Sequence, residues 1–423
     1  MFLYRALAAA SLAAYAPYAL LRSVAGGRRL GDLRGRFGLT PWPDLDGGIW
    51  IHAVSVGELG VARNLLAALS LARPGGRMGV SVTTAAGREL AERSFPAGVP
   101  VFAFPFDLGR PVENALSQTR PGLVLLTETE IWPLFLERAE RRGIPVALVN
   151  GRLSERSFRR YSRAPRFMCE TLGRLSLFAM QSQEDARRVL ALGAPAGRVR
   201  VTGNLKYDLP DTGPFPDAAR LSESAAGRPV IAAASTAEGE EDLVLAAWSA
   251  LAPRPLLLLA PRRPERFDGV ARLCESRGLT VLRRSHPASR LRQADVYLLD
   301  SIGELAAAYR QCLVAFVGGS LVPRGGQNPI EAWAAGVPAL AGPHMENFRD
   351  VARAGQDRGI LERVADAPAL ARALAAAIAE PGAARARGSE AARLVEENRG
   401  AAERTAKEVL ALAPTPAARG EAS

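Results

Sequence analysis

Glutamates follow strand-like segments at five places, each three positions after a small polar residue. The pairs are Ser55/Glu58, Thr127/Glu130, Ser235/Glu238, Ser301/Glu304 and Asn328/Glu331. A helical pattern follows each pair. The simplest interpretation of any one pair is therefore a capping box, in which the glutamate accepts a backbone N–H at the helix start. A carboxylate at such a place can also act as a general base and remove a proton from a substrate hydroxyl.

Helix starts of this kind also favour anionic ligands, because their N–H groups and positive dipole ends face outward. Two glycine-rich turns lie nearby, "FVGGS" at 316–320 and "PRGGQNPIE" at 323–331. Their glycines allow a ligand to approach the backbone closely. Neither turn is a Walker loop or a G-x-G-x-x-G dinucleotide motif. We therefore expect a phosphate or nucleotide site that is not of the kinase or dehydrogenase type.

The elements that position these residues alternate between strand and helix from Ile49 onward. The expected strands are GIWIHAVS, RMGVSVTT, VPVFAFPF, LVLLTE, PVALVNG, LSLFAMQS and RVRVTGN, then VIAAAS, PLLLLAP, LTVLRR, DVYLLD, LVAFVGG and VPALAGP. Apolar strands separated by helices predict parallel sheets covered on both faces. Two such runs predict an α/β protein with two Rossmann-like domains facing across a cleft. All five pairs fall at carboxyl ends of strands, where such domains bind ligands.

Composition suggests where the domains begin and end. Residues 209–228 are rich in proline, glycine and serine and are expected to form a linker. The linker separates a first domain at 22–208 from a second at 229–412. Residues 413–423 are expected to be a frayed tail.

The net charge narrows the class of ligand. The 423 residues include 54 Lys and Arg against 43 Asp and Glu, which gives +11. This excess suits an anionic membrane face or a phosphorylated substrate. Nucleic acid is not expected, because there is no basic aromatic helix and no zinc-finger spacing. Three scattered cysteines fit reduced thiols, and three histidines without a Cys/His cluster make a metal site unexpected.

The N-terminal segment has the features of a membrane anchor. Residues 6–21, ALAAASLAAYAPYALL, carry no charge, and arginines follow at 22, 28, 29, 34 and 36. A signal peptide carries its charges before the apolar run, whereas charge after the run keeps the remaining chain in the cytoplasm. We expect residues 1–21 to be an uncleaved anchor, spanning the bilayer or lying in its interface. The alternative is a buried helix.

Nine stretches in order resemble the Kdo transferases, the membrane-anchored GT-B glycosyltransferases that attach 3-deoxy-D-manno-octulosonic acid (Kdo) to the lipid A precursor. The stretches are IWIHAVSVGE, TETEIWPLF, NGRLSERSF, GNLKYD, ASTAEGEE, PRRPERF, DSIGEL, FVGGSLVPRGGQNPIEA and GPHMENF. They run from about Trp50 to Phe348 and cover both expected domains. The resemblance is therefore more specific than a single glycine motif would be.

The resemblance implies an inverting transfer from CMP-Kdo to the lipid A precursor at the cytoplasmic face of the inner membrane, with no cofactor and no metal. It places the general base at Glu58. Inversion needs one base for the acceptor hydroxyl, whereas retention would need a second, nucleophilic carboxylate. Glu128 and Lys206 match family residues assigned to the transition state. On residue type alone, these two side chains could equally be a salt-bridged loop residue and a surface lysine.

The same resemblance implies a CMP site in the second domain. Its residues are Pro261, Arg262, Ile302, Gly303, Glu304, Asn328, Pro329, Ile330 and Glu331. Glu331 is expected to accept hydrogen bonds from ribose hydroxyls, and Arg262 can bind a phosphate or carboxylate. The chain departs from the family at Ala237, Arg263 and Gln327, where members commonly have histidine. These departures put in doubt a protonation role near the donor.

Two alternatives stay open beside the Kdo transferase. One is a GT-B enzyme that uses another nucleotide sugar, with the same fold and base but a different donor pocket. The other is a membrane-anchored binding protein with an inactive site, suggested only by the missing histidines. Intact Glu58 and Lys206 argue against the inactive protein.

Overall fold

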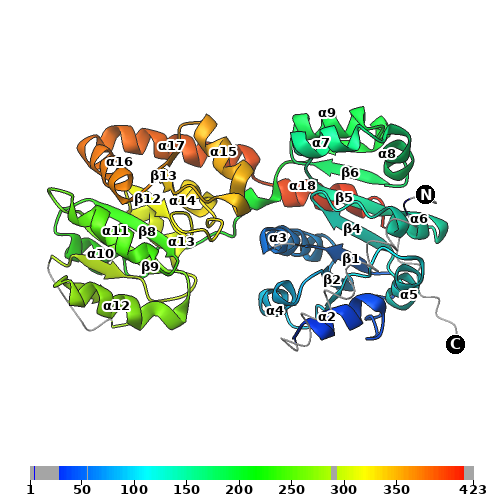
Figure 1. Cartoon of the computed structure of the whole chain (residues 1–423), viewed down its shortest axis with the longest axis horizontal. Coiled ribbons are helices and arrows are strands. Elements are labelled where there is room, and N and C mark those ends of the chain that lie inside the picture. The colour runs from blue at the N-terminus through cyan, green and yellow to red at the C-terminus, as the bar shows by residue number, and fades with distance from the viewer. Residues whose placement is uncertain (1–3, 5–27, 55, 287–292, 414–423) are drawn as a thin grey trace. The chain divides into compact units, whose positions relative to one another are not determined.

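The computed structural model describes residue 4 and residues 28–54, 56–286 and 293–413. It divides into two compact units, which are described separately (Figure 1). Unit 1 comprises Met1–Asp208 together with the segment from Asn398 onward, and unit 2 comprises Leu209–Glu397. Each unit holds a seven-stranded sheet in which every pair of neighbouring strands is parallel. The prediction of two parallel α/β sheets is confirmed.

Unit 1 has the strand order β3-β2-β1-β4-β5-β6-β7. Its strands are β1 Ile49–His52, β2 Met78–Val82, β3 Val101–Ala103, β4 Leu123–Thr127, β5 Val146–Gly151, β6 Leu177–Met180 and β7 Val199–Val201. Its helices are α2 Arg28–Phe37, α3 Val56–Ala72, α4 Ala85–Ser94, α5 Gly109–Thr119, α6 Pro133–Arg141, α7 Glu155–Tyr161, α8 Pro165–Leu172, α9 Gln183–Ala191 and α18 Ala401–Leu410, with 3-10 turns η1 Ala196–Arg198 and η2 Leu205–Tyr207.

Two apolar cores cover the two faces of this sheet. Side chains from α3, α4 and α18 bury one face, and side chains from α5, α6, α8 and α9 bury the other. Strands β1 to β6 are apolar because both of their faces are buried, as expected of a parallel sheet. Each strand therefore delivers its following loop to the same edge of the sheet.

Unit 2 has the strand order β10-β11-β9-β8-β12-β13-β14. Its strands are β8 Val230–Thr236, β9 Leu256–Pro261, β10 Val281–Arg283, β11 Val296–Leu298, β12 Val314–Val317, β13 Ala339–Ala341 and β14 Leu361–Arg363. Its helices are α10 Ala218–Ala225, α11 Glu240–Ser249, α12 Phe267–Ser276, α13 Leu305–Ala308, α14 Ile330–Ala334, α15 Arg349–Asp357, α16 Ala367–Ala379 and α17 Pro381–Asn398, with 3-10 turns η3 Pro264–Arg266, η4 Tyr309–Gln311 and η5 Glu346–Phe348.

The boundaries between the units differ from those expected at 209–228 and 229–412. Residues 209–228 include α10, whose Leu221 and Ala225 are buried in the core of unit 2. At the other end, α18 returns to unit 1 and packs on α3 through Ala402, Ala406 and Val409. The carboxylate of Asp208 accepts the N–H groups of Gly400 and Ala402 and so caps α18. Composition alone does not reveal these long-range contacts.

The expected anchor at 1–21 lies outside the described residues except for Tyr4. The Tyr4 hydroxyl donates to Asp107 Oδ2 at 2.7 Å, and the same carboxylate accepts the N–H groups of Leu134 and Phe135 at the start of α6. No helix in the described ranges combines the length and the apolar character needed to cross a bilayer. Of the basic tract, Arg36 faces the body of unit 1: its Nε donates to the Phe104 carbonyl at 3.1 Å, and its guanidinium lies 4.0 Å from the Phe106 ring centre.

Candidate active site

Glu58 lies in the first turn of α3, directly after the carboxyl end of β1. Its carboxylate is buried, with 7% of the residue exposed. Oε2 accepts the N–H of Val54 at 2.8 Å and lies 2.7 Å from the Thr127 hydroxyl. That hydroxyl is also 2.8 Å from the His52 carbonyl, so its single proton is shared between two acceptors. Ser55, the other half of the expected capping box, lies outside the described residues.

Thr127 is the last residue of β4, so this contact fixes Glu58 against the neighbouring strand. A pure helix cap would need only the N–H groups at the start of its own helix. The contact from β4 is an additional restraint, and it orients the carboxylate at the sheet edge. The expected role of Thr127 as the cap partner of Glu130 is therefore wrong. In addition, the next helix, α6, begins only at Pro133, after an N-cap at Trp132.

Glu128 and Lys206 form an ion pair at the same edge. Lys206 Nζ lies 2.6 Å from Glu128 Oε1, and each side chain is 14% exposed. Glu128 has a φ of +54°, which is uncommon for a residue other than glycine. Its N–H donates to the Val149 carbonyl of β5 at 3.0 Å, which stabilises this conformation.

Two asparagines bring Lys206 to this place on the short turn η2. Asn204 Oδ1 accepts the N–H of Lys206 at 3.0 Å. Asn150 Oδ1, at the carboxyl end of β5, accepts the N–H of Leu205 at 3.0 Å. Asn64 of α3 donates to the Leu205 carbonyl at 2.8 Å, so the helix that carries Glu58 is joined to the turn that carries Lys206. The structure therefore brings Glu58, Glu128 and Lys206 to one edge of one sheet.

Glu130 is a third carboxylate at this edge whose importance the sequence did not indicate. Burial raises the pKa of Glu130, the charge of Glu58 raises it further and that of Glu128 adds a smaller part, to about 7. A hydrogen bond with Trp132 and the charge of Arg36 act in the opposite direction. Glu130 therefore titrates near neutral pH beside the candidate base. The signal available in the sequence was the repeated glutamate of TETE at one strand end.

His52, the last residue of β1, is buried beneath this edge. Its ring stacks on Phe104 with 3.8 Å between ring centres, and its Nδ1 lies 2.9 Å from Ser81 Oγ. Burial lowers the pKa of His52 to about 3. The imidazole is therefore uncharged at neutral pH and packs against Phe104.

Several of the predicted donor-site residues of unit 2 lie on turns that follow its central strands. Arg262 follows β9, its N–H donates to the Thr236 carbonyl at 3.0 Å, and its Nε lies 3.3 Å from Gln327 Oε1. One departure from the family pattern, Gln327, is thus a direct partner of Arg262. Asn328 Oδ1 accepts the N–H of Ile330 at 3.1 Å at the start of α14.

The buried members of this set can meet a ligand only through backbone atoms. Pro261 ends β9 inside the core, and Pro329 and Ile330 are also buried. Glu331 is partly buried in the first turn of α14.

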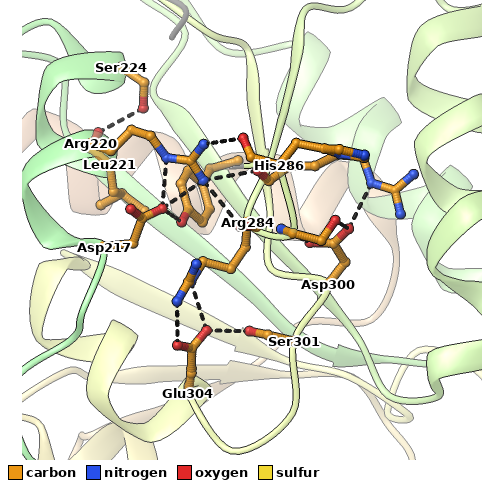
Figure 2. Close-up of polar contacts among 12 residues, drawn as sticks. Asp217, Arg220, Leu221, Ser224, Arg284, His286, Asp300, Ser301 and Glu304 are labelled. Atoms are coloured by element: carbon orange, nitrogen blue, oxygen red, sulfur yellow. Dashed lines mark hydrogen bonds and ion pairs between the residues drawn. The ribbon is translucent and has the colours of Figure 1, made fainter. Parts of the chain in front are cut away.

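Arg284 and Ser301 hold the loop of Ile302, Gly303 and Glu304. Arg284 forms a two-point contact with Glu304, Nε at 2.9 Å and Nη2 at 2.8 Å, and the Ser301 hydroxyl also donates to Glu304 (Figure 2). Burial acts to raise the pKa of Glu304, but these hydrogen bonds outweigh it and lower the pKa. Ile302, in contrast, is 80% exposed, and Gly303 has a φ of +85°. The loop therefore presents an apolar side chain next to a fixed carboxylate.

Arg220 of α10 fixes the strand end that carries Arg284. Figure 2 shows its guanidinium between Asp217 and the backbone of β10 and its loop, where it donates to the carbonyls of Arg283 at 2.9 Å and His286 at 2.7 Å. The segment expected to be a linker thus supports the predicted donor site.

Glu240 organises the glycine-rich turn after β12. Its buried carboxylate accepts the N–H groups of Ala237, Ser320 and Leu321, each at 2.8 Å, and that of Gly319. The sequence assigned the helix cap after β8 to Glu238, which is exposed, whereas Glu240 accepts the N–H of Ala237 there. Ser235 has a φ of +54°, and this turn moves the cap position along the chain to Glu240. Among the described residues no three His, Cys, Asp or Glu side chains are grouped so that they could hold a metal ion.

Two family models match the chain. The model of 3-Deoxy-D-manno-octulosonic-acid transferase (kdotransferase) matches residues 31–209, and that of glycosyl transferases group 1 matches residues 286–395. A 3-deoxy-D-manno-octulosonic acid transferase from Bordetella pertussis is 39% identical over 352 residues, which cover 79% of this chain and 80% of that protein. A transferase of the same name from Haemophilus influenzae is 34% identical over 386 residues, which cover 89% and 90%.

Two solved structures are also similar. The C-terminal CMP-Kdo binding domain of WaaA from Acinetobacter baumannii is 33% identical with a TM-score of 0.40, and the match covers 43% of this chain and 97% of that domain. The glycotransferase of kitacinnamycin is 17% identical with a TM-score of 0.52 over 88% of this chain and all of that one. At this identity the second match concerns the fold alone.

Proposed function

Since the chain belongs to the family of 3-deoxy-D-manno-octulosonic acid (Kdo) transferases, we propose that it moves Kdo from CMP-Kdo to a lipid A precursor with Glu58 as its general base. The enzyme is a glycosyltransferase of lipopolysaccharide biosynthesis. The GT-B architecture expected from the sequence, with an N-terminal anchor at the cytoplasmic face of the inner membrane, is part of this proposal.

The position of Glu58 is the observation that carries the proposal. The carboxylate is buried at the carboxyl end of β1, where parallel sheets bind ligands. The Val54 N–H donates to its Oε2, and the Thr127 hydroxyl lies 2.7 Å from the same oxygen. A base fixed in this way has lost most of its rotational freedom before the substrate arrives, which favours proton transfer.

The reaction follows from these roles. The acceptor hydroxyl gives its proton to Glu58 as its oxygen forms a bond to the anomeric carbon of Kdo. The bond between that carbon and the phosphate oxygen of CMP breaks, and CMP leaves with the electron pair. Attack from the face opposite CMP inverts the anomeric centre, so the enzyme needs no carboxylate nucleophile.

The Glu128–Lys206 pair supplies charge beside this step. Lys206 can offset the negative charge of the donor's carboxylate or phosphate, and Glu128 orients Lys206 through the 2.6 Å contact. The strained backbone of Glu128 is consistent with this role, since strain of this kind gathers at functional sites.

Unit 2 is proposed to bind CMP-Kdo without a metal or another cofactor. Arg262 would bind phosphate, and Glu331 would accept from the ribose hydroxyls. Glu304 is held by Arg284 and is proposed to contact the nucleotide as well, with the exposed Ile302 beside it. Gln327 stands where the family commonly has histidine, and it contacts Arg262. No proton transfer is therefore assigned to the donor-site residues.

Incubation of the protein with CMP-Kdo and a lipid A precursor tests the proposed function. The expected result is a product heavier by one or more Kdo units, read by mass spectrometry. Thermal stabilisation by CMP, compared with UDP, provides a second measurement. Stabilisation by UDP alone, or an unchanged acceptor mass, would contradict the proposal.

A further inference from the structure

The helix α7 carries arginines on its outer side. It begins four residues after the end of β5, and Phe158 and Tyr161 anchor it against the core of unit 1. Arg156, Arg159 and Arg160 are exposed and have the i, i+3, i+4 spacing of one helical face. Arg163, also exposed, follows two residues after the helix ends.

These arginines line a hollow with a volume of about 690 Å³, together with Glu155 and Ser157. Four positively charged side chains and one negatively charged side chain therefore line the hollow. Arg159 Nε binds Glu155 Oε1 at 2.9 Å, and the Arg160 guanidinium lies 5.0 Å from the Tyr161 ring centre. In the described part of the chain, Arg156 and Arg163 have no side-chain partner. We call this feature the arginine hollow.

Arg156 and Arg163 are not needed to hold α7 in place. Ser154 Oγ caps the helix by accepting the N–H of Ser157, and Arg188 fixes its start through the Leu153 carbonyl at 2.8 Å. Like charges three or four residues apart, such as Arg156 with Arg159 and Arg160, destabilise a helix. Arg156 in the helix and Arg163 two residues beyond it therefore add positive charge without a side-chain partner among the described residues, and an anionic ligand explains them best.

The hollow belongs to the same sheet edge as the candidate base. β5 pairs with β4, which pairs with β1, so the loop that leads to α7 is next along the edge to those of Glu128 and Glu58. A ligand with a hydroxyl at Glu58 can present a second group toward this part of the edge. Guanidinium groups match the oxygens of phosphate and of carboxylate in two-point contacts, and of these two groups the acceptor of the proposed reaction carries phosphate.

We propose that the arginine hollow binds a phosphate group of the acceptor glycolipid and so selects phosphorylated acceptors. This inference rests on the proposed function, because the acceptor is taken to be a phosphorylated sugar. The occupant is the acceptor rather than bulk membrane lipid. A discrete hollow with two unpartnered arginines suits one bound phosphate, whereas attraction to a charged surface needs no hollow.

The double variant Arg156→Gln/Arg163→Gln tests the proposal with two acceptors, the lipid A precursor and the same glycolipid after phosphatase treatment, both in neutral detergent micelles. Hydrogen bonds to charged groups contribute more than those between neutral groups, and exposed side chains lose part of this contribution to solvent. The variant should therefore lose about 10- to 100-fold in kcat/KM with the phosphorylated acceptor and little with the dephosphorylated one. Arg93→Gln, which removes an exposed arginine of α4, is the matched control and should lose nothing.

Binding of each acceptor without donor gives a second readout. If the wild type transfers no Kdo, the proposed function fails, but tighter binding of the phosphorylated acceptor that the variant lacks still supports the hollow. Equal losses with both acceptors, or no loss with either, would overturn the proposal. A variant that instead keeps its preference for the phosphorylated acceptor and loses only its binding to phosphatidylglycerol vesicles would show that the hollow binds membrane lipid. That result would also overturn the proposal.

Discussion

Replacing Glu130 with glutamine should stabilise the protein at alkaline pH. The pKa of this carboxyl is about 7 in the folded chain, against an ordinary value of 4.5. Between these two values the folded state binds a proton that the unfolded state has released, so stability falls as pH rises through this window. A shift of this size corresponds to about 3 kcal/mol. Because Glu130 is partly exposed, we expect the variant to be more stable than the wild type by about 1–3 kcal/mol at pH 8.

Thermal melting of wild type and Glu130→Gln from pH 4.5 to 8.5 measures this effect. The two proteins should melt alike near pH 4.5, where Glu130 is protonated. The variant should melt higher by a few degrees at pH 8, since about 1 kcal/mol shifts a domain of this size by roughly 2–4 °C. Glu89→Gln, on the exposed side of α4, is the matched control and should run parallel to wild type. A Glu130→Gln curve that also runs parallel to wild type would refute the idea that Glu58 and burial hold a proton on Glu130.

Three further predictions concern other parts of the chain. Burial holds His52 neutral, so its effect on the pH dependence of stability has the opposite sign. The neutral ring contributes to the stability of the folded state above pH 6.5. This stability is lost as pH falls toward 3, by about 2 kcal/mol at pH 5. A melting curve of His52→Gln with the same acid slope as wild type would contradict this. Glu331→Ala should weaken CMP more than acceptor binding, measured by calorimetry, and should also lower the melting temperature if the start of α14 loses about 1 kcal/mol; unchanged CMP affinity would remove Glu331 from the donor site. Deleting residues 1–21 should leave a folded body that binds anionic liposomes weakly and in a salt-sensitive way, although it loses the Tyr4–Asp107 hydrogen bond. Release of the full-length protein from membranes by high salt would contradict the anchor.

Most of the fold could be predicted because apolar strands buried on both faces leave a strong signal. All thirteen expected strands are present. One further strand, β14, was not expected from the sequence. It has only three residues, and two of them are Glu362 and Arg363. At the edge of a sheet such a strand lacks the continuous apolar run that marks a central one. The return of α18 to unit 1 was missed because it depends on packing against α3, far away in the sequence.

The candidate site could be predicted in part, and only with the family resemblance. Spacing alone proposed five helix caps, but Glu240 rather than Glu238 accepts the N–H of Ala237 before α11, and the Thr127 hydroxyl contacts Glu58 rather than Glu130. Both errors arise where Ser235 or Glu128 adopts a positive φ, which local patterns do not reveal. The partnership of Glu128 and Lys206 depends on the loops after β4 and β7 meeting in space.

The general base is tested most directly by Glu58→Gln. The amide keeps the shape of the side chain but cannot accept the proton, so transfer of Kdo in a single turnover should fall by at least about 100-fold. Because unit 2 is proposed to bind the donor, affinity for CMP should stay at the wild-type value. Glu238→Gln, which changes an exposed carboxylate, is the control and should keep its activity. Transfer by Glu58→Gln at a rate near that of wild type would show that Glu58 only caps α3.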